Sequence, residues 1–198
     1  MSDRETVAVY DAQVGDYAKL VRDDRPDQDL RRFMDAVPPS GRVLDLGCGT
    51  GNSAYQMAVA GFDVVATDAS GEMVTHARER YKIDARQATF DDLSEENTYD
   101  GVWANFSLLH AERRHFPSHL TSVRRALKTD GIFHIGMKLG SGEHRDGIGR
   151  FYCYYSEQDL SAHLQHARFD ILHRRKGETK GLAGTVDPFT VILCRARD

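Results

Sequence analysis

The chain has 198 residues, of which 40% are hydrophobic and 28% are charged, as is typical of a folded globular domain of ordinary size. Its formal net charge at pH 7 is −4, which excludes the strong overall basic field that attracts nucleic acid. No apolar run approaches the roughly 20 residues that a membrane-spanning helix needs, so we expect neither a nucleic-acid partner nor a membrane partner.

The three cysteines, Cys48, Cys153 and Cys194, are odd in number and far apart, so a disulfide framework is not expected. Residues 1–5 lack the basic start and the apolar stretch of a signal peptide. A cytoplasmic location is therefore the expectation.

Helical and strand patterns alternate along the chain, which predicts a parallel sheet with helices on both of its faces. Two helices are expected first, over residues 5–20 and 27–37, with the polar residues 22–26 between them. The five strands that follow are expected at residues 42–46, 62–67, 84–88, 99–105 and 132–138. The helices between these strands are expected at residues 52–60, from Ser70 onward, and at residues 113–127.

The last third of the chain has a different pattern. Residues 139–150 contain four glycines and are expected to form a long loop. A helix is then expected from Ser156 to about His166, because serine is a good N-terminal cap. Two final strands are expected at residues 169–174 and 189–195. Their connection, residues 176–188, has no helical pattern, which favours an antiparallel pair.

The most informative segment is residues 43–51, with the sequence Val-Leu-Asp-Leu-Gly-Cys-Gly-Thr-Gly. A short apolar strand runs into three glycines at alternate positions, Gly47, Gly49 and Gly51. Glycine has no Cβ, so such a turn lets the backbone approach a ligand closely. A dinucleotide-binding fingerprint needs the spacing G-x-G-x-x-G, whereas the spacing here is G-x-G-x-G with Asp45 two residues ahead. This segment resembles the first motif of the class I S-adenosylmethionine (SAM)-dependent methyltransferases.

The resemblance implies a Rossmann-like α/β fold: a doubly wound, seven-stranded, mostly parallel sheet whose last strand is antiparallel, with helices on both faces. It implies one methyltransferase domain over residues 1–198, with SAM as the cofactor. Within it we expect an N-terminal helical lead-in or lid, a SAM-binding core, an acceptor-side loop, and a C-terminal helix with a strand pair. These parts are expected at residues 1–40, 41–138, 139–155 and 156–198.

The resemblance also assigns cofactor contacts at the ends of the first two strands. The residues expected in the turn beneath the amino-acid and ribose parts of SAM are Asp45, Gly47, Cys48, Gly49 and Gly51. Asp68 follows the second strand and would accept hydrogen bonds from both ribose hydroxyls; the alternative is an aspartate that only caps a helix or turn. Ala69 lies beside it, and Met73 would pack its thioether on the adenine face or simply belong to the core.

Two further strand ends are expected to complete the cofactor site. After the third strand many family members have an aspartate that contacts the adenine amino group, but Thr89 stands at the matching position here. Thr89 or Asp91 would meet that amino group, and the Phe90 backbone would reach the ring; the alternative for Asp91 is a surface loop. The fourth strand ends at Asn105, which the resemblance places beneath the methionine part of SAM.

The residues after Asn105 bear on the acceptor. Methyltransferases that act on nucleic-acid bases often carry Asn/Asp-Pro-Pro-Tyr/Phe at this point, whereas this chain has Asn-Phe-Ser-Leu. The Leu-Leu-His sequence that ends at His110 resembles the small-molecule branch of the family. His110 could orient or deprotonate an acceptor, because histidine titrates near neutral pH; the alternative is a histidine that only shapes the pocket.

Charged and aromatic side chains gather after the fifth strand, on the side where the acceptor is expected. Lys138 and Arg150 would hold a carboxylate of the acceptor, Arg150 as a bidentate fork. The alternative is a solvated loop in which Arg150 pairs with Glu143 or Asp146.

Tyr10 and Tyr17 are seven residues apart in the first expected helix and therefore share one face. In similar methyltransferases an N-terminal helix closes over the cofactor, and we assign the tyrosine contact to Tyr17; the alternative is that each ring only packs. The histidine pairs His115–His119 and His163–His166 lack the H-E-x-x-H pattern and a cysteine pair. No metal site is expected.

The sequence therefore predicts a SAM-dependent methyltransferase (EC 2.1.1.-) acting on a small polar molecule, with anionic acceptors among the options. One alternative is a non-catalytic SAM-binding or scaffold protein, which would leave no acceptor pocket. A second is an NAD-dependent oxidoreductase, against which the glycine spacing argues. A third is a macromolecular target such as a protein side chain. The protein is expected to be a monomer or a homodimer.

Overall fold

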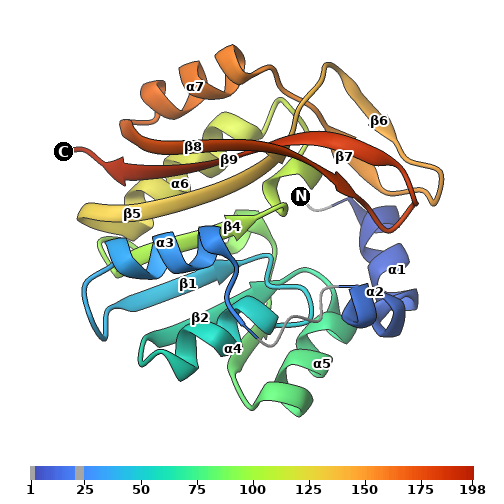
Figure 1. Cartoon of the computed structure of the whole chain (residues 1–198), viewed down its shortest axis with the longest axis horizontal. Coiled ribbons are helices and arrows are strands. Elements are labelled where there is room, and N and C mark those ends of the chain that lie inside the picture. Colours follow the sequence, from blue (N-terminus) through green and yellow to red (C-terminus); the bar gives the residue numbers. More distant parts are fainter. Residues whose placement is uncertain (1–2, 21–24) are drawn as a thin grey trace.

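The computed structural model describes residues 3–20 and 25–198, and a seven-stranded sheet runs through its centre (Figure 1). The strands are β1 (Arg42–Leu46), β2 (Asp63–Asp68), β3 (Asp84–Gln87), β4 (Tyr99–Asn105), β5 (Leu127–Lys138), β8 (Phe169–Lys180) and β9 (Val186–Ala196). Their order is β3-β2-β1-β4-β5-β9-β8. Strands β1 to β5 pair in parallel, whereas β9 runs antiparallel to both neighbours, β5 and β8. The expected mostly parallel sheet with a reversed last strand is confirmed.

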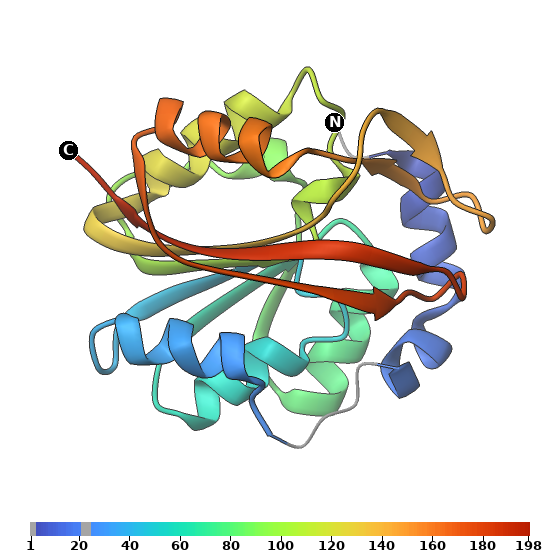
Figure 2. The ribbon, with the colours of Figure 1, turned by 45° about the horizontal axis from the view of Figure 1, so that its top comes forward.

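Helices cover both faces of the sheet (Figure 2). One face carries α3 (Gln28–Ala36), α4 (Asn52–Val59) and α5 (Gly71–Tyr81), and the other carries α6 (Phe116–Ala126) and α7 (Glu157–His166). Two further helices, α1 (Arg4–Ala12) and α2 (Val14–Leu20), lie beside the edge where the parallel strands end (Figure 1). Two 3-10 turns, η1 (Phe90–Asp92) and η2 (Leu108–His110), follow β3 and β4. No helix in the described ranges is long and apolar enough to cross a membrane.

Apolar side chains on both sheet faces explain this layering. β4 and β5 are buried along almost their whole length, as parallel strands covered on both sides are. On one face Phe33 of α3 packs against Trp103 of β4, with ring centroids 5.3 Å apart. On the other face Phe116 of α6 and Leu160 of α7 are fully buried. Each such side chain contributes about 1.5–3 kcal/mol of transfer free energy.

Element boundaries differ from the expected ones in several places, among them β5, which begins at Leu127 and not at Ile132. The first expected helix is divided at Gln13 into α1 and α2. Helix α6 begins at Phe116, later than expected, with Pro117 in its first turn, where a missing backbone N–H costs nothing. Residues 139–150 are not wholly a loop, because β6 (Glu143–Arg145) pairs antiparallel with β7 (Phe151–Cys153). Of the polar residues 22–26, residues 22–24 lie outside the described ranges.

The final strand pair is longer than the sequence pattern suggests. The antiparallel pairing of β8 with β9 continues as far as Lys180 opposite Val186. Most of residues 176–188 is therefore strand, and only a short turn joins the two. The expected antiparallel arrangement without a helix is confirmed.

The turn after β1 ties together the ends of three neighbouring strands. The backbone N–H groups of Gly47 and Cys48 both donate to the Thr67 carbonyl oxygen of β2, at 2.8 and 2.9 Å. After β4, Ser107 donates from Oγ to the Leu46 carbonyl oxygen at 2.6 Å. Gly47 has a φ of +80°, and a Cβ added there would lie 2.3 Å from the Ser107 Cβ. This position therefore requires glycine for two reasons, its backbone conformation and the close approach of Ser107.

Replacing Gly47 with alanine is expected to destabilise the fold more than the same change at Gly142. The two glycines have φ values of +80° and +79°, so alanine strains either backbone by about 1–2 kcal/mol. Only at Gly47 does the added methyl group also collide with a neighbour, since nothing in the described chain lies within 4 Å of a Cβ on Gly142. Overpacking adds about 1–3 kcal/mol. Urea unfolding measures both free energies; equal losses would contradict the close approach to Ser107.

Candidate active site

A cavity opens at the edge of the sheet where the parallel strands end. Its empty space, counted with its open mouth, is about 770 Å³. Its lining comes from the ends of β1, β2 and β4, from the segments around η1 and η2, and from α1 and α2. The strand order reverses between β1 and β4, and ligands of open α/β sheets bind at such a point.

Most residues selected from the sequence line this cavity. The predicted residues that line it are Tyr17, Gly47, Gly49, Asp68, Ala69, Met73, Thr89, Phe90, Asn105 and His110. The other predicted residues, which are not among the described lining residues, are Asp45, Cys48, Gly51, Lys138 and Arg150. The fold thus brings together segments from α2 to η2 that are widely spaced in the sequence.

The Asp68 carboxylate, at the end of β2, is held in place by backbone groups. Its Oδ2 accepts a hydrogen bond from the Gly49 N–H at 2.8 Å, and its Oδ1 accepts one from the Ser70 N–H at 2.9 Å. Burial raises the pKa of Asp68, and the hydrogen bonds from Ser70 and Gly49 oppose that rise. Asp68 therefore anchors the turn and also presents a carboxylate to the cavity, so its two interpretations are compatible.

Three residues of the glycine segment support the turn from outside the cavity. Asp45 is 2% exposed, and its Oδ2 has no hydrogen-bond partner among the described residues. Burial, assisted by the charge of Asp68, raises the pKa of Asp45 to about 8. A Cβ on Gly51 would lie 2.7 Å from the Ala77 Cβ, so Gly51 lets α4 and α5 pack closely. Cys48 donates its backbone N–H to the Thr67 carbonyl oxygen of β2. That Asp45, Cys48 and Gly51 contact the cofactor stays a prediction.

The residues expected near adenine have distinct surroundings. Met73 is 1% exposed and also lines the cavity, so it belongs to the core and its contact with adenine stays a prediction. Thr89 donates from both its N–H and its Oγ1 to Asp92 Oδ2, at 2.8 Å each. Phe90 follows it on the cavity wall. Asp91 is exposed and is not among the described lining residues, which favours the surface-loop alternative for it.

Aromatic rings continue along the cavity from the glycine turn to η2. The Tyr17 ring lies against Gly49, where an added Cβ would sit 3.2 Å from Cε1. Tyr17 and Tyr10 meet edge to face with ring centroids 5.7 Å apart, and Tyr10 meets His110 in the same way at 5.4 Å. The two tyrosines share one side of the N-terminal segment although a break at Gln13 separates their helices.

The His110 ring forms a hydrogen bond through each nitrogen. Nδ1 lies 2.6 Å from the Phe151 carbonyl oxygen of β7, and Nε2 lies 2.9 Å from the Tyr10 hydroxyl. Burial lowers the pKa of His110 to about 4, and the positive charges of Arg150 and Lys138 also lower it. The imidazole is therefore neutral at pH 7 and is already engaged on both sides.

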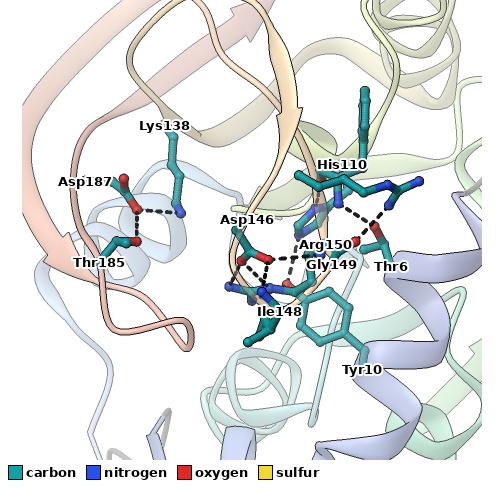
Figure 3. Close-up of polar contacts among 12 residues, drawn as sticks. Thr6, Tyr10, His110, Lys138, Asp146, Ile148, Gly149, Arg150, Thr185 and Asp187 are labelled. Carbon is teal, nitrogen blue, oxygen red and sulfur yellow. Dashed lines mark hydrogen bonds and ion pairs between the residues drawn. The ribbon is translucent and has the colours of Figure 1, made fainter.

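Lys138 and Arg150, which were expected to hold an acceptor carboxylate, have carboxylate partners within the chain (Figure 3). Lys138 Nζ donates to Asp187 Oδ2 at 2.7 Å. Arg150 donates from Nε and Nη2 to Asp146 Oδ2, at 3.0 and 2.8 Å. Arg150 is 3% exposed, so this pair is buried and the loop is not the solvated one considered above. Both positive charges are compensated inside the protein.

Sequence reasoning missed several residues that line the cavity. Thr6 and Val7 come from α1, and Phe106 and Ser107 follow β4. Phe106 has a φ of +57°, a conformation that a bulky residue adopts only where its surroundings enforce it. For α1 a signal existed, because Thr6 lies one helical turn before Tyr10 on the same face. For Phe106 and Ser107 no local pattern marks the site.

Three of the four histidines in the two pairs, His115, His119 and His163, pack against other rings. The rings of His115 and His119 lie 6.3 Å apart, and His163 packs its edge against Phe116 at 5.5 Å. In residues 3–20 and 25–198 no group of three or more His, Cys, Asp or Glu side chains is arranged to hold a metal ion.

Comparisons with known proteins agree with this geometry. A family model described as a methyltransferase domain matches residues 43–131. The cypemycin N-terminal methyltransferase of a Streptomyces species is 39% identical over 48% of this chain and 41% of its own length. The trans-aconitate 2-methyltransferase of Rhodococcus jostii is 38% identical over 51% of this chain and 38% of its own length. The chain thus spans less than half the length of these two relatives.

A solved structure extends the similarity to the whole fold. The 1,6-didemethyltoxoflavin-N1-methyltransferase of Burkholderia thailandensis, solved with 1,6-didemethyltoxoflavin and S-adenosylhomocysteine bound, aligns with 100% of this chain and 92% of its own. The TM-score is 0.75 and the sequence identity is 21%, so this likeness concerns the fold. The glycine turn, the strand order and the matched family model together show that residues 43–131 form a methyltransferase domain on the fold of the class I SAM-dependent enzymes.

Proposed function

We propose that this protein transfers a methyl group from SAM to a small, polar, uncharged molecule. The observation that carries the proposal is a single cavity that joins Asp68 and the glycine turn to a second group of side chains from α1 and η2. The first group suits the cofactor, and the second suits an acceptor beside it. The names of the two curated relatives specify different acceptors, so we argue the acceptor from the cavity itself.

The residues at the strand ends fit SAM. Asp68 presents a carboxylate that can accept hydrogen bonds from ribose hydroxyls. Gly47 and Gly49 have no side chain to occupy the space over the turn, and Met73 and Phe90 supply apolar surface for an adenine ring. When bound, the cofactor supplies a methyl group activated by a sulfonium charge. The protein then has to align the acceptor with that methyl group and to exclude water from the site.

An uncharged acceptor suits the second group better than an anion. No Lys or Arg is among the described residues that line the cavity. Lys138 and Arg150, the two nearest candidates from the sequence, are neutralised by Asp187 and Asp146. An anion in this space would lose its hydration without gaining a cationic partner, which costs several kcal/mol by order of magnitude. We therefore propose an uncharged acceptor and not an anionic one.

The extent of the cavity also favours an enzyme over a non-catalytic SAM-binding protein. A scaffold would need only the cofactor end, whereas this cavity continues past Asn105 to Tyr10 and His110. The G-x-G-x-G spacing remains the argument against an NAD-dependent oxidoreductase.

Replacing Asp68 with alanine is expected to weaken SAM binding at least about 100-fold. Two hydrogen bonds to a charged group would be lost, each of about 1.5–3 kcal/mol. The control is Asp63→Ala at the exposed start of the same strand, which is expected to bind SAM as the wild type does. Calorimetric titration with SAM and with S-adenosylhomocysteine measures the affinities, and thermal unfolding verifies that both variants are folded. Unchanged affinity in Asp68→Ala would refute the assigned site, and folded wild-type protein that binds neither ligand would refute the function.

A further inference from the structure

A continuous run of hydrogen bonds joins α1 to the β6–β7 hairpin at the acceptor end of the cavity (Figure 3). Arg150 Nη1 donates to the Tyr10 hydroxyl at 3.0 Å, and that hydroxyl lies 2.9 Å from His110 Nε2. We propose that Tyr10 takes up the proton of a hydroxyl-bearing acceptor while it passes its own proton to His110. This inference rests on the proposed function.

The partners of His110 define which ring nitrogen carries hydrogen. A carbonyl oxygen can only accept, so Nδ1 carries the hydrogen that it donates to Phe151. In the neutral ring Nε2 is then bare, and it accepts the hydrogen of the Tyr10 hydroxyl. A pKa lowered to about 4 by burial agrees with a neutral ring at pH 7.

The Tyr10 hydroxyl therefore stands between the basic nitrogen of His110 and a molecule in the cavity. The single basic nitrogen of His110 is covered by the Tyr10 hydroxyl, and Tyr10 itself lines the cavity. The proton of an acceptor reaches Nε2 through the Tyr10 oxygen. In this proposal His110 does not take the proton from the acceptor directly, as considered from the sequence, but receives a proton from Tyr10.

Neighbouring groups prepare the Tyr10 oxygen for a transient negative charge. Arg150 donates to it from a guanidinium that Asp146 holds in place. Burial nevertheless raises the pKa of Tyr10, and the charge of Asp68 raises it further, so the phenol keeps its proton at rest. Such a phenol can take a proton only as it releases its own, and His110 Nε2 is already in place to receive it.

In the proposed step the acceptor loses its O–H bond as its oxygen bonds to the methyl carbon. The acceptor's proton goes to the Tyr10 oxygen, and the Tyr10 proton goes to His110 Nε2, which becomes an imidazolium. The electron pair of the broken carbon–sulfur bond stays on the cofactor's sulfur. Because burial disfavours the charged ring, the imidazolium returns its extra proton to water after the product leaves.

The weak basicity of His110 selects the kind of acceptor. An alcohol or phenol oxygen becomes strongly acidic as a methyl group bonds to it, so a weak base can take its proton in the transition state. An amine nitrogen stays basic after methylation and gains nothing from such a base. The rings of Tyr10, Tyr17 and Phe106 on the cavity wall favour a flat, largely apolar body. The acceptor class is therefore a small neutral phenol or a related alcohol.

Phenol and pyridine serve as probes of the relay. Both are flat and largely uncharged at pH 7, but pyridine has no proton to release when its nitrogen is methylated and therefore needs no relay. Tyr10→Phe keeps the ring and removes the hydroxyl. We expect methylation of phenol to fall about 100-fold in this variant, and methylation of pyridine to change less than about threefold. Mass spectrometry measures the methylated products. The matched control is Tyr55→Phe, at a 40% exposed position on α4, which is expected to leave both rates unchanged.

Each other outcome overturns a defined part of the proposal. If Tyr10→Phe loses the same factor in rate with both probes, Tyr10 has a structural role only. If its rate with phenol is unchanged, the acceptor's proton is taken up by a group other than Tyr10. Wild-type protein that binds SAM but methylates neither probe would overturn the acceptor class. Wild-type protein that does not bind SAM would instead mark a failure of the proposed function, which the calorimetric titration detects separately.

The hydrogen-bond directions have a test that does not depend on turnover. Nitrogen-15 NMR of the histidine-labelled protein with S-adenosylhomocysteine is expected to show His110 neutral, with its hydrogen on Nδ1, until the pH approaches its pKa of about 4. In Tyr10→Phe the Nε2 resonance is expected to shift, because its donor is lost, while Nδ1 keeps its bond to Phe151. A hydrogen on Nε2, or an imidazolium at pH 7, would overturn the relay.

Discussion

The close approach of Gly47 to Ser107, at the ends of β1 and β4, is the constraint on which the rest of the site depends. These two strands are the ones between which the sheet order reverses. A side chain at Gly47 would push them apart, and it would also disturb the two backbone hydrogen bonds that the turn makes to Thr67 of β2. Because the three strand ends stay together, Asp68 and Asn105 lie around one space.

Helix α1 forms the opposite wall of that space. Each end of α1 is held by hydrogen bonds to a different part of the chain. Near its end, Asp11 accepts hydrogen bonds from Ser70 Oγ at 2.5 Å and from the Glu72 N–H at 3.3 Å, at the start of α5. Near its beginning, Thr6 Oγ1 accepts one from the Phe151 N–H of the hairpin at 2.8 Å. Buried polar groups with satisfied partners fix orientation. Tyr10, between these anchors, is therefore directed at His110.

The end of the cavity beside α1 and η2, where we propose that the acceptor binds, contains charges that are compensated within the protein. A buried ion pair such as Arg150 with Asp146 contributes little net stability, although the loss of one partner is costly. Its effect here is to bring a guanidinium to the Tyr10 hydroxyl without offering a free cation to the cavity. The Tyr10 hydroxyl therefore has a positively charged hydrogen-bond donor, while the cavity surface beside it carries no uncompensated cation.

The sequence by itself determined the parallel sheet, the glycine turn and the carboxylate after β2. Each depends on spacings of a few residues, such as alternate glycines after an apolar strand, which report local backbone conformation directly. Only the tertiary structure decided the acceptor end: the hairpin within residues 139–150, the choice of Asp146 for Arg150, and the contact of Tyr10 with His110 across 100 residues. Such contacts follow from how α1, η2 and the hairpin pack against one another, and no local pattern encodes that packing.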